Sequence, residues 1–252
     1  MLDLNSRSQL SDRINYLVDK AINDNAEAPR TYLGCSAIGG TCERAVQADY
    51  ISAEHARTGK GDVPQEEIPA RTRRIFTRGH VLESYIAGWV RESGLMLITE
   101  QDGKQFPVSL ANDRLPGHVD GIIFHYIGEG DSPIPLPALW ECKVLGHKGW
   151  NELQKKHVKV SHPKYFVQVQ LYMAGLGLKQ CLLTACDADT MELHHELIPY
   201  DGGETLQKMT ERLDRIERAS SMGEWLPRGS RSPAEIQCKM CRWQSECWSD
   251  ES

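Results

Sequence analysis

The sequence lacks several features that would each assign the chain to a particular class of protein. None of its apolar runs approaches the roughly 20 residues that a membrane-spanning helix needs. Its first residues, MLDLNSRSQLSDRINYL, are charged and have neither the apolar stretch nor the cleavage site of a secretory signal. Internal repeats and low-complexity tracts are also missing. These absences predict a cytoplasmic protein with no membrane partner.

An excess of positive charge is absent too. The net charge of −6 argues against a protein that coats nucleic acid through bulk charge, although local patches set the field around a site. Two basic segments form such patches: Arg71, Arg73, Arg74 and Arg78, and then Lys155, Lys156, Lys159 and Lys164. Each is either a surface that contacts DNA or an ordinary solvated helix face. Their positions on either side of the acidic motifs described below favour DNA.

The pattern of hydrophobic residues predicts one domain with an α/β core. The 252 residues, 40% of them hydrophobic, suffice for one substantial core. Helical spacing predicts helices over residues 6–24, 42–56, 70–93, 149–157, 163–178 and 203–219. Strands are predicted over residues 95–99, 105–110, 117–126, 138–145, 180–185 and 191–198, and a polar loop over 58–67. This order indicates a central mixed sheet flanked by helices, with a core over about 70–220.

Two carboxylates and an ammonium are predicted to meet inside this sheet. Asp120 lies in the apolar segment LPGHVDGIIF, and Glu141 and Lys143 lie in PALWECKVLG. Alternate residues of a strand share a face, so Glu141 and Lys143 point the same way and Cys142 points the other way. Buried carboxylates are costly unless a partner neutralises them, and Mg²⁺ or Mn²⁺ is the natural partner. The alternative is a buried ion pair without a metal.

Cysteines form a second group. Eight cysteines without a secretory signal indicate reduced thiolates that hold a metal rather than a disulfide framework. Cys238, Cys241 and Cys247 have the spacing C-x2-C-x5-C, and one upstream cysteine would complete a set of four. Four thiolates suit either tetrahedral zinc or an iron–sulfur cluster, and spacing alone does not separate the two. Cys181 and Cys186 are predicted to pack in the core.

These motifs resemble those of the PD-(D/E)XK nuclease superfamily, in particular its RecB-like iron–sulfur branch. GHVDG and WECK resemble motifs II and III of the superfamily. The helical segment GHVLE ends at Glu83 and resembles a G-x-x-x-(H/E) motif, so Glu83 would be a further metal ligand. Many relatives have histidine at that position, which makes the nearby His80 a rival candidate. Gln168 and Tyr172, one helical turn apart, resemble the Q-x-x-x-Y motif and would serve the reaction.

The resemblance implies a restriction-endonuclease-like core and a structural [4Fe–4S] cluster. In the iron–sulfur relatives, which include CRISPR-associated exonucleases and AddB-type nuclease domains, one cysteine precedes the nuclease motifs and three follow them. The chain also resembles phage-encoded exonucleases, which are similar to it at Glu83. The upstream ligand would be Cys42, with Cys35 as the alternative, and zinc remains the alternative metal. The cluster would join the N-terminal part (1–57) to the tail (221–252). The Cys142 carbonyl would add a ligand to the catalytic Mg²⁺ or Mn²⁺.

The function implied is hydrolysis of phosphodiester bonds in DNA, as an exonuclease rather than an endonuclease. The substrate would be single-stranded DNA or DNA with single-stranded ends, in recombination, repair, phage or CRISPR-related processing. Lys143 would orient the attacking water or stabilise charge on the phosphate. Trp150 and Tyr165 are candidate stacking surfaces, or else core residues. Two alternatives stay open: a catalytically silent subunit with a nuclease fold, and a zinc-stabilised enzyme of other chemistry. The sequence identifies no protein partner.

Overall fold

The computed structural model describes residues 7–26, 28–59 and 68–249. Its centre is a five-stranded mixed sheet in the order β1-β6-β7-β8-β9. Strands β7 and β8 are parallel, and the other neighbouring pairs are antiparallel. The five strands are β1 (Leu95–Ile98), β6 (Gly121–Tyr126), β7 (Ala138–Leu145), β8 (Gln180–Asp187) and β9 (Leu193–Pro199). The predicted mixed sheet flanked by helices is confirmed.

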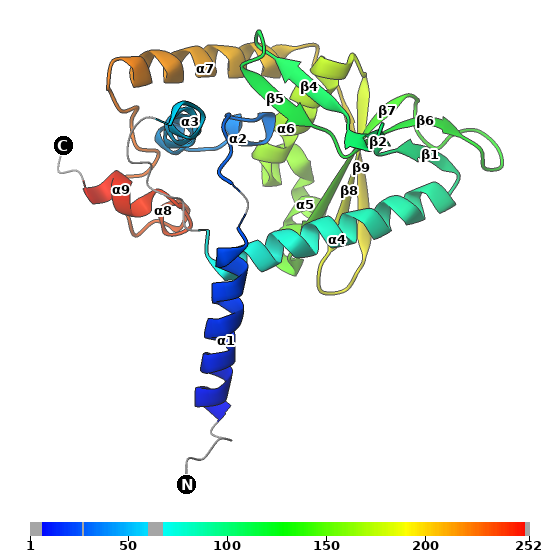
Figure 1. Cartoon of the computed structure of the whole chain (residues 1–252). Coiled ribbons are helices and arrows are strands. Elements are labelled where there is room, and N and C mark those ends of the chain that lie inside the picture. Colours follow the sequence, from blue (N-terminus) through cyan, green and yellow to red (C-terminus); the bar gives the residue numbers. More distant parts are fainter. Residues whose placement is uncertain (1–6, 27, 60–67, 250–252) are drawn as a thin grey trace.

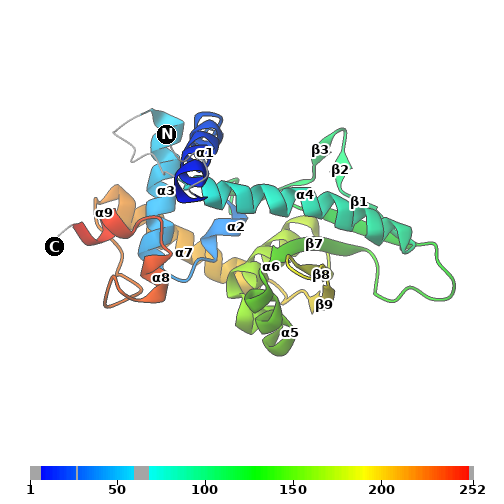
Figure 2. The same cartoon turned by 90° about the horizontal axis from the view of Figure 1, so that it is seen from below.

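Helices cover both faces of this sheet (Figures 1 and 2). Helix α4 (Ala70–Glu92) packs on one face, and α5 (His147–Ser161) and α6 (Pro163–Leu176) pack on the other. Strand β7 is central and buried on both sides, because its alternate residues enter two different hydrophobic clusters. Trp140 belongs to the cluster under α4, whereas Leu139 belongs to the cluster under α6.

The remaining elements lie around this core. Two small hairpins separate β1 from β6: β2 (Glu100–Gln101) with β3 (Lys104–Gln105), and β4 (Pro107–Leu110) with β5 (Leu115–His118). The other helices are α1 (Arg7–Asp24), α2 (Cys35–Ile38), α3 (Glu43–Thr58), α7 (Glu204–Ser221), α8 (Ile236–Lys239) and α9 (Gln244–Ser249). Figure 1 shows α3, α8 and α9 grouped at one end of the molecule, away from the central sheet.

Three predicted elements differ from the structure. The strand predicted over 117–126 is two strands, β5 and β6, which belong to different sheets. The strand predicted over 105–110 begins only at Pro107. The helix predicted to end at 157 continues to Ser161 across a kink at His157, where φ is 59°. The kink is held from outside the helix, because the Glu196 carboxylate accepts a hydrogen bond from the backbone N–H of Val158 at 2.9 Å.

Part of the predicted loop, residues 60–67, lies outside the described residues, as do residue 6 of the first predicted helix and residues 250–252 of the tail. In the part of the chain that the structure describes, no helix combines the length and the apolar character needed to cross a membrane.

Candidate functional site

The break between β5 and β6 positions Asp120. Its side chain accepts a hydrogen bond from the backbone N–H of Cys142 at 2.9 Å. The carboxylate therefore replaces the backbone carbonyl of a neighbouring strand as the acceptor for this N–H. Asp120 was predicted to lie inside a strand, and this is wrong: it lies just before β6 begins at Gly121. The bond nevertheless fixes Asp120 against the middle of β7.

Glu141 lies at the centre of the site. Its side chain is fully buried, and Oε1 accepts hydrogen bonds from Lys143 Nζ at 2.5 Å and from Gln168 Nε2 at 2.8 Å. Gln168 in turn lies 3.2 Å from the Tyr172 hydroxyl, one helical turn further along α6. The other carboxylate oxygen, Oε2, is buried and has no hydrogen-bond partner among the described residues. Two residues, Lys143 from β7 and Gln168 from α6, therefore bind one oxygen of this carboxylate, and its other oxygen has no partner among the described residues.

Two carboxylates of the site, those of Glu141 and Glu83, are at least partly buried and lie close to other acidic groups, and both conditions raise their pKa values. Burial, and then the charge of Asp120, raise the pKa of Glu141 to about 8. The same two causes raise the pKa of Glu83, on α4, to about 7, although Lys143 opposes them. For Lys143, burial alone would lower the pKa, but the charges of Glu141 and Asp120 outweigh burial and raise it. Protons therefore occupy part of this site at neutral pH, and a bound cation would displace them.

The donor set is one that hard divalent cations prefer, since it consists of carboxylate oxygens. Within residues 7–26, 28–59 and 68–249, however, no three histidine, cysteine, aspartate or glutamate side chains converge closely enough to hold a metal as they stand. Mg²⁺ is commonly held by one or two carboxylates together with waters and substrate phosphates, so a complete protein cage is not required. The unpartnered Oε2 of Glu141 is the atom that such an ion would satisfy.

The two candidates on α4 differ in position. Glu83 is half-buried and interacts electrostatically with Asp120 and Lys143, whereas His80 is exposed. Glu83 is therefore the α4 residue that lies with the acidic group. Cys142 is buried on the opposite face of β7, in the cluster under α4, as the alternation of the strand predicts.

Several residues of the two basic segments already interact with other groups of the chain. Arg74 forms an ion pair with Asp19 of α1, and Arg73 donates to the Ile68 carbonyl at 3.2 Å. Lys156 pairs with Glu152, and Lys159 lies 5.2 Å from the centre of the Phe166 ring. The remaining members, Arg71, Lys155 and Lys164, are exposed, while Arg78 is half-buried. DNA contact by these residues stays a prediction.

The two candidate stacking residues, Trp150 and Tyr165, differ in burial. Trp150 is buried, with 5% of its surface exposed, and its indole N–H donates to the Ala185 carbonyl at 3.3 Å. The suggestion that Trp150 offers a stacking surface is therefore wrong, because its ring fills the core. Tyr165 is half-buried, stacks on His162 with ring centres 5.3 Å apart, and lies 5.2 Å from Lys143 Nζ. Tyr165 remains a candidate, and His162 is a neighbour that the sequence pattern did not single out.

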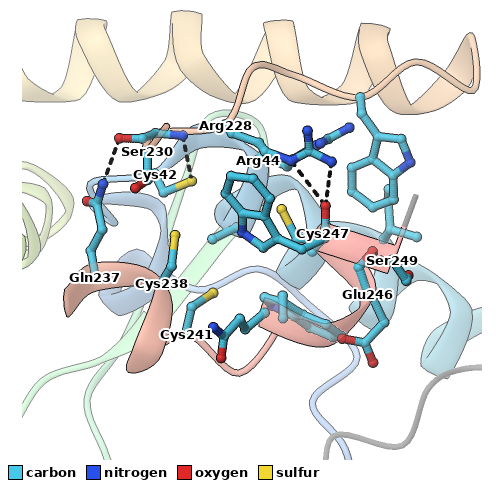
Figure 3. A pocket seen from close by; sticks show the side chains of 18 of the residues that line it. Cys42, Arg44, Arg228, Ser230, Gln237, Cys238, Cys241, Glu246, Cys247 and Ser249 are labelled. Atoms are coloured by element: carbon cyan, nitrogen blue, oxygen red, sulfur yellow. Dashed lines mark hydrogen bonds between the residues drawn. The ribbon is translucent and has the colours of Figure 1, made fainter. Parts of the chain in front are cut away.

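A second candidate site lies at the other end of the molecule. Cys42, which immediately precedes α3, and the three tail cysteines line one cavity of about 390 Å³ (Figure 3). The tail cysteines are Cys238 in α8, Cys241 in the following turn and Cys247 in α9. Figure 3 shows all four thiols around this space. The backbone N–H of Gly229 donates to Cys42 Sγ at 3.3 Å.

The two candidates for the upstream ligand, Cys35 and Cys42, have different surroundings. Cys35 is fully buried beside β5, where its thiol donates to the Leu115 carbonyl at 3.4 Å. Burial raises the pKa of the Cys35 thiol to about 12, which disfavours the thiolate that a metal requires. Cys42 lies with the tail and Cys35 does not. Cys181 and Cys186 are buried in β8, as predicted for core residues.

Polar contacts attach the tail to α3. The buried side chain of Gln47 donates to the Glu224 carbonyl at 2.7 Å and accepts from the Leu226 N–H at 2.8 Å. Asp49 accepts from the Trp243 indole at 2.5 Å and pairs with Arg242 at 2.6 Å. These residues were missed in the sequence, because a lone Gln or Asp on a helix gives no sign of a partner nearly two hundred residues away.

Comparisons with known proteins give structural neighbours only. No family model matches the sequence, and no curated protein matches it. Among solved structures, the chain is similar to the alkaline exonuclease LHK-Exo from Laribacter hongkongensis, with 15% identity, 81% of this chain and 95% of that chain covered, and a TM-score of 0.48. The same exonuclease in complex with dAMP gives 16% identity, 82% and 95% coverage, and a TM-score of 0.49. A structure of SSO0001 gives 13% identity, 95% and 98% coverage, and a TM-score of 0.48. At these values a functional assignment depends on the residues of the site itself.

Proposed function

We propose that this protein is a metal-dependent DNA nuclease, with exonuclease action as the first form to test. The observation that carries the proposal is the environment of Glu141. One oxygen of this fully buried carboxylate accepts hydrogen bonds from an ammonium and an amide, and the other oxygen has no partner in the described part of the chain. The Asp120 and Glu83 carboxylates lie close enough to raise its pKa. Such an arrangement is costly to fold and is explained by a cation and an anionic substrate that complete it.

Each residue has a role in this proposal. Glu141, Asp120 and Glu83 would hold Mg²⁺ or Mn²⁺, with the Cys142 carbonyl as a further ligand. The bound ion supplies a polarised water and stabilises charge on the phosphate. Lys143 would then place its ammonium beside the water or the phosphate oxygens. Gln168 would keep Glu141 in position from α6, with Tyr172 behind it.

The four cysteines are proposed to hold a [4Fe–4S] cluster that fastens the tail to α3. In support of a shared metal site, Cys42 and the three tail cysteines line one cavity, whereas Cys35 lies elsewhere beside β5. Zinc is the alternative. Metal analysis and the visible spectrum of anaerobically purified protein separate the two, because zinc is colourless and the cluster is brown.

The test of the nuclease proposal uses labelled single-stranded and double-stranded DNA with and without Mn²⁺. Lys143→Ala should abolish cleavage while the melting temperature and metal content of the cysteine site stay unchanged. Lys104→Ala, which removes an exposed lysine on β3, is the matched control and should cleave normally. Near-normal cleavage by Lys143→Ala would overturn the assignment of the acidic site.

A second candidate function is a nuclease-fold subunit that binds DNA without cutting it. Within the described ranges the side chains do not by themselves complete a metal site, and this candidate would not need one. The retention of Glu141, Lys143 and Gln168 as a buried group argues against it, because a silent subunit gains nothing from buried charges. The same assay decides, since this candidate predicts salt-sensitive DNA binding with no cleavage under any divalent cation.

A further inference from the structure

A groove on the outer surface of the tail is lined by arginine and tryptophan. Its volume is about 460 Å³, and its walls include Arg44 of α3 and the tail residues Trp225, Arg228, Arg231 and Trp248. All of these except Arg231 also line the cysteine cavity. The groove is therefore built against that cavity, at the end of the molecule where α3 and α9 lie and away from the central sheet (Figure 1).

The charge of this groove is not balanced by its own lining. Among the described residues, three arginines and no acidic residue line it, in a chain whose net charge is −6. In the described part of the chain, neither Arg44 nor Arg231 forms an ion pair, and Arg44 Nε is buried without a hydrogen-bond partner. Arg228 donates through Nε and Nη2 to the Cys247 carbonyl, at 3.1 and 2.7 Å. Arg44 and Arg231 thus present guanidinium groups that suit an anionic ligand with several oxygens.

The aromatic residues add a second kind of contact. Trp225 leaves 47% of its surface exposed, which is unusual for the largest apolar side chain. The Arg44 guanidinium lies 5.4 Å from the centre of the Trp225 ring, and the Arg228 guanidinium lies 4.6 Å from the centre of the Trp248 ring. Indole faces beside guanidinium groups are a combination that holds flat bases and phosphates together.

We propose that this groove binds a single strand of nucleic acid, with a base stacked on Trp225 and phosphates against Arg44 and Arg231. The inference rests on the proposed function in one respect, which is that the strand is DNA that also reaches the acidic site. The groove would hold the strand at a second point, so that affinity and cleavage depend on different residues. Acidic protein segments are the competing ligand, because they supply negative charge without bases.

The test measures binding in the absence of cleavage. Protein carrying Glu141→Gln is titrated into a fluorescent oligo-thymidine strand in EDTA, and into a strand of the same length that lacks bases. The groove variants are Trp225→Leu, Trp225→Phe and Arg231→Glu. Arg13→Glu is the matched control, because Arg13 is exposed on α1 and the change in charge is the same. Metal content and melting temperature are measured for every variant.

Stacking and charge predict different patterns. Trp225→Leu should weaken binding of oligo-thymidine by about tenfold and leave the strand without bases almost unaffected, whereas Trp225→Phe should restore most of the affinity. Arg231→Glu should weaken both strands and reduce the slope of log affinity against log salt by about one phosphate contact. Arg13→Glu should bind like the parent protein.

Three results would overturn the proposal. The first is parent-like binding by both Trp225→Leu and Arg231→Glu, and the second is equal loss in Arg13→Glu. The third is displacement of the strand by poly-glutamate at equal charge concentration, which would assign the groove to acidic protein segments. If Trp225→Leu loses its metal, the result for Arg231→Glu still tests the groove, because Arg231 is exposed and its substitution should leave the cysteine cavity intact. Cleavage by the otherwise unmodified protein is scored separately, so failure of the nuclease proposal and failure of the groove are distinguishable.

Discussion

The unpartnered Oε2 atom of Glu141 is a local source of instability in the metal-free protein. Glu141→Gln keeps the shape of the side chain and removes the buried charge. We expect this variant to lose cleavage and, in EDTA, to melt at the same temperature as the unaltered protein or higher. Calorimetry with and without Mn²⁺ measures both stability and metal binding. A lower melting temperature in EDTA would show that the carboxylate itself stabilises the fold.

The raised pKa values of Glu83 and Glu141 predict how stability depends on pH. Their ordinary value is 4.5, and in the folded protein they reach about 7 and about 8. Between these limits the two carboxyl groups hold more protons in the folded state than in the unfolded state, so their contribution to stability falls as pH rises from about 5 to about 8. Lys143 contributes no slope there, because its pKa lies above this range in both states.

This dependence is measured by thermal melts in EDTA, where about 1 kcal/mol corresponds to roughly 2–4 °C for a chain of this size. Glu141→Gln should flatten the curve. The affinity for Mn²⁺ should increase with pH, because the ion competes with the protons on Glu83 and Glu141. An equal pH dependence in Glu141→Gln and in the unaltered protein would contradict the raised pKa of Glu141.

At the scale of elements, the contact between α3 and the tail depends on the absence of a side chain at Gly229. A Cβ atom there would lie 3.1 Å from Cys42 Cβ and 3.2 Å from its Sγ. We therefore expect Gly229→Val to displace Cys42 and to lower metal content and melting temperature together. Gly88→Ala in α4 is the control, because nothing lies within 4 Å of its Cβ position, and it should stabilise the helix by about 0.5–1 kcal/mol.

Gln47 connects the same two elements through hydrogen bonds. Gln47→Leu would leave the Glu224 carbonyl and the Leu226 N–H without their partner, which costs about 1–3 kcal/mol when such groups remain buried. Thermal melts and limited proteolysis should show a less stable protein that is cut first within the tail. Gln154→Leu, at an exposed position of α5, provides the comparison. Equal proteolysis of the two variants would remove Gln47 from this role.

The sequence predicts the elements of the core better than their connections. Periodicity identifies α4, α6, α7 and the strands β7 and β8 because their apolar residues repeat with the period of a helix or occupy a continuous buried run. The kink at His157 and the break at Asp120 depend on contacts with Glu196 and with the backbone of Cys142, which are distant in sequence. The grouping of Asp120, Glu141 and Lys143 was accessible from strand alternation, whereas the orphaned Oε2 and the tail groove were not.

For the whole molecule, a metal shared by Cys42 and Cys247, as proposed above, would close a loop of about two hundred residues. Closing so long a loop restricts the unfolded chain, and the free energy of metal binding becomes free energy of folding. We expect Cys241→Ser and Cys42→Ser to lower metal content, solubility and melting temperature together. Cys35→Ser should have a mild effect on metal content. Wild-type metal and melting in both Cys42→Ser and Cys241→Ser would exclude a four-cysteine site.

The separation of Cys42 from Cys247 also has a consequence for the order of events during synthesis. At about 5–20 residues per second, roughly 10–40 s pass between the emergence of the first of these cysteines and the last. The Asp49 contacts of α3 cannot form until Trp243 has been synthesised, whereas the Gln47 contacts can form once Leu226 has been synthesised. A ribosome stalled before Glu224 should therefore carry a chain whose central sheet resists protease while α3 is still cut, and release of the complete chain should protect α3 and the tail together.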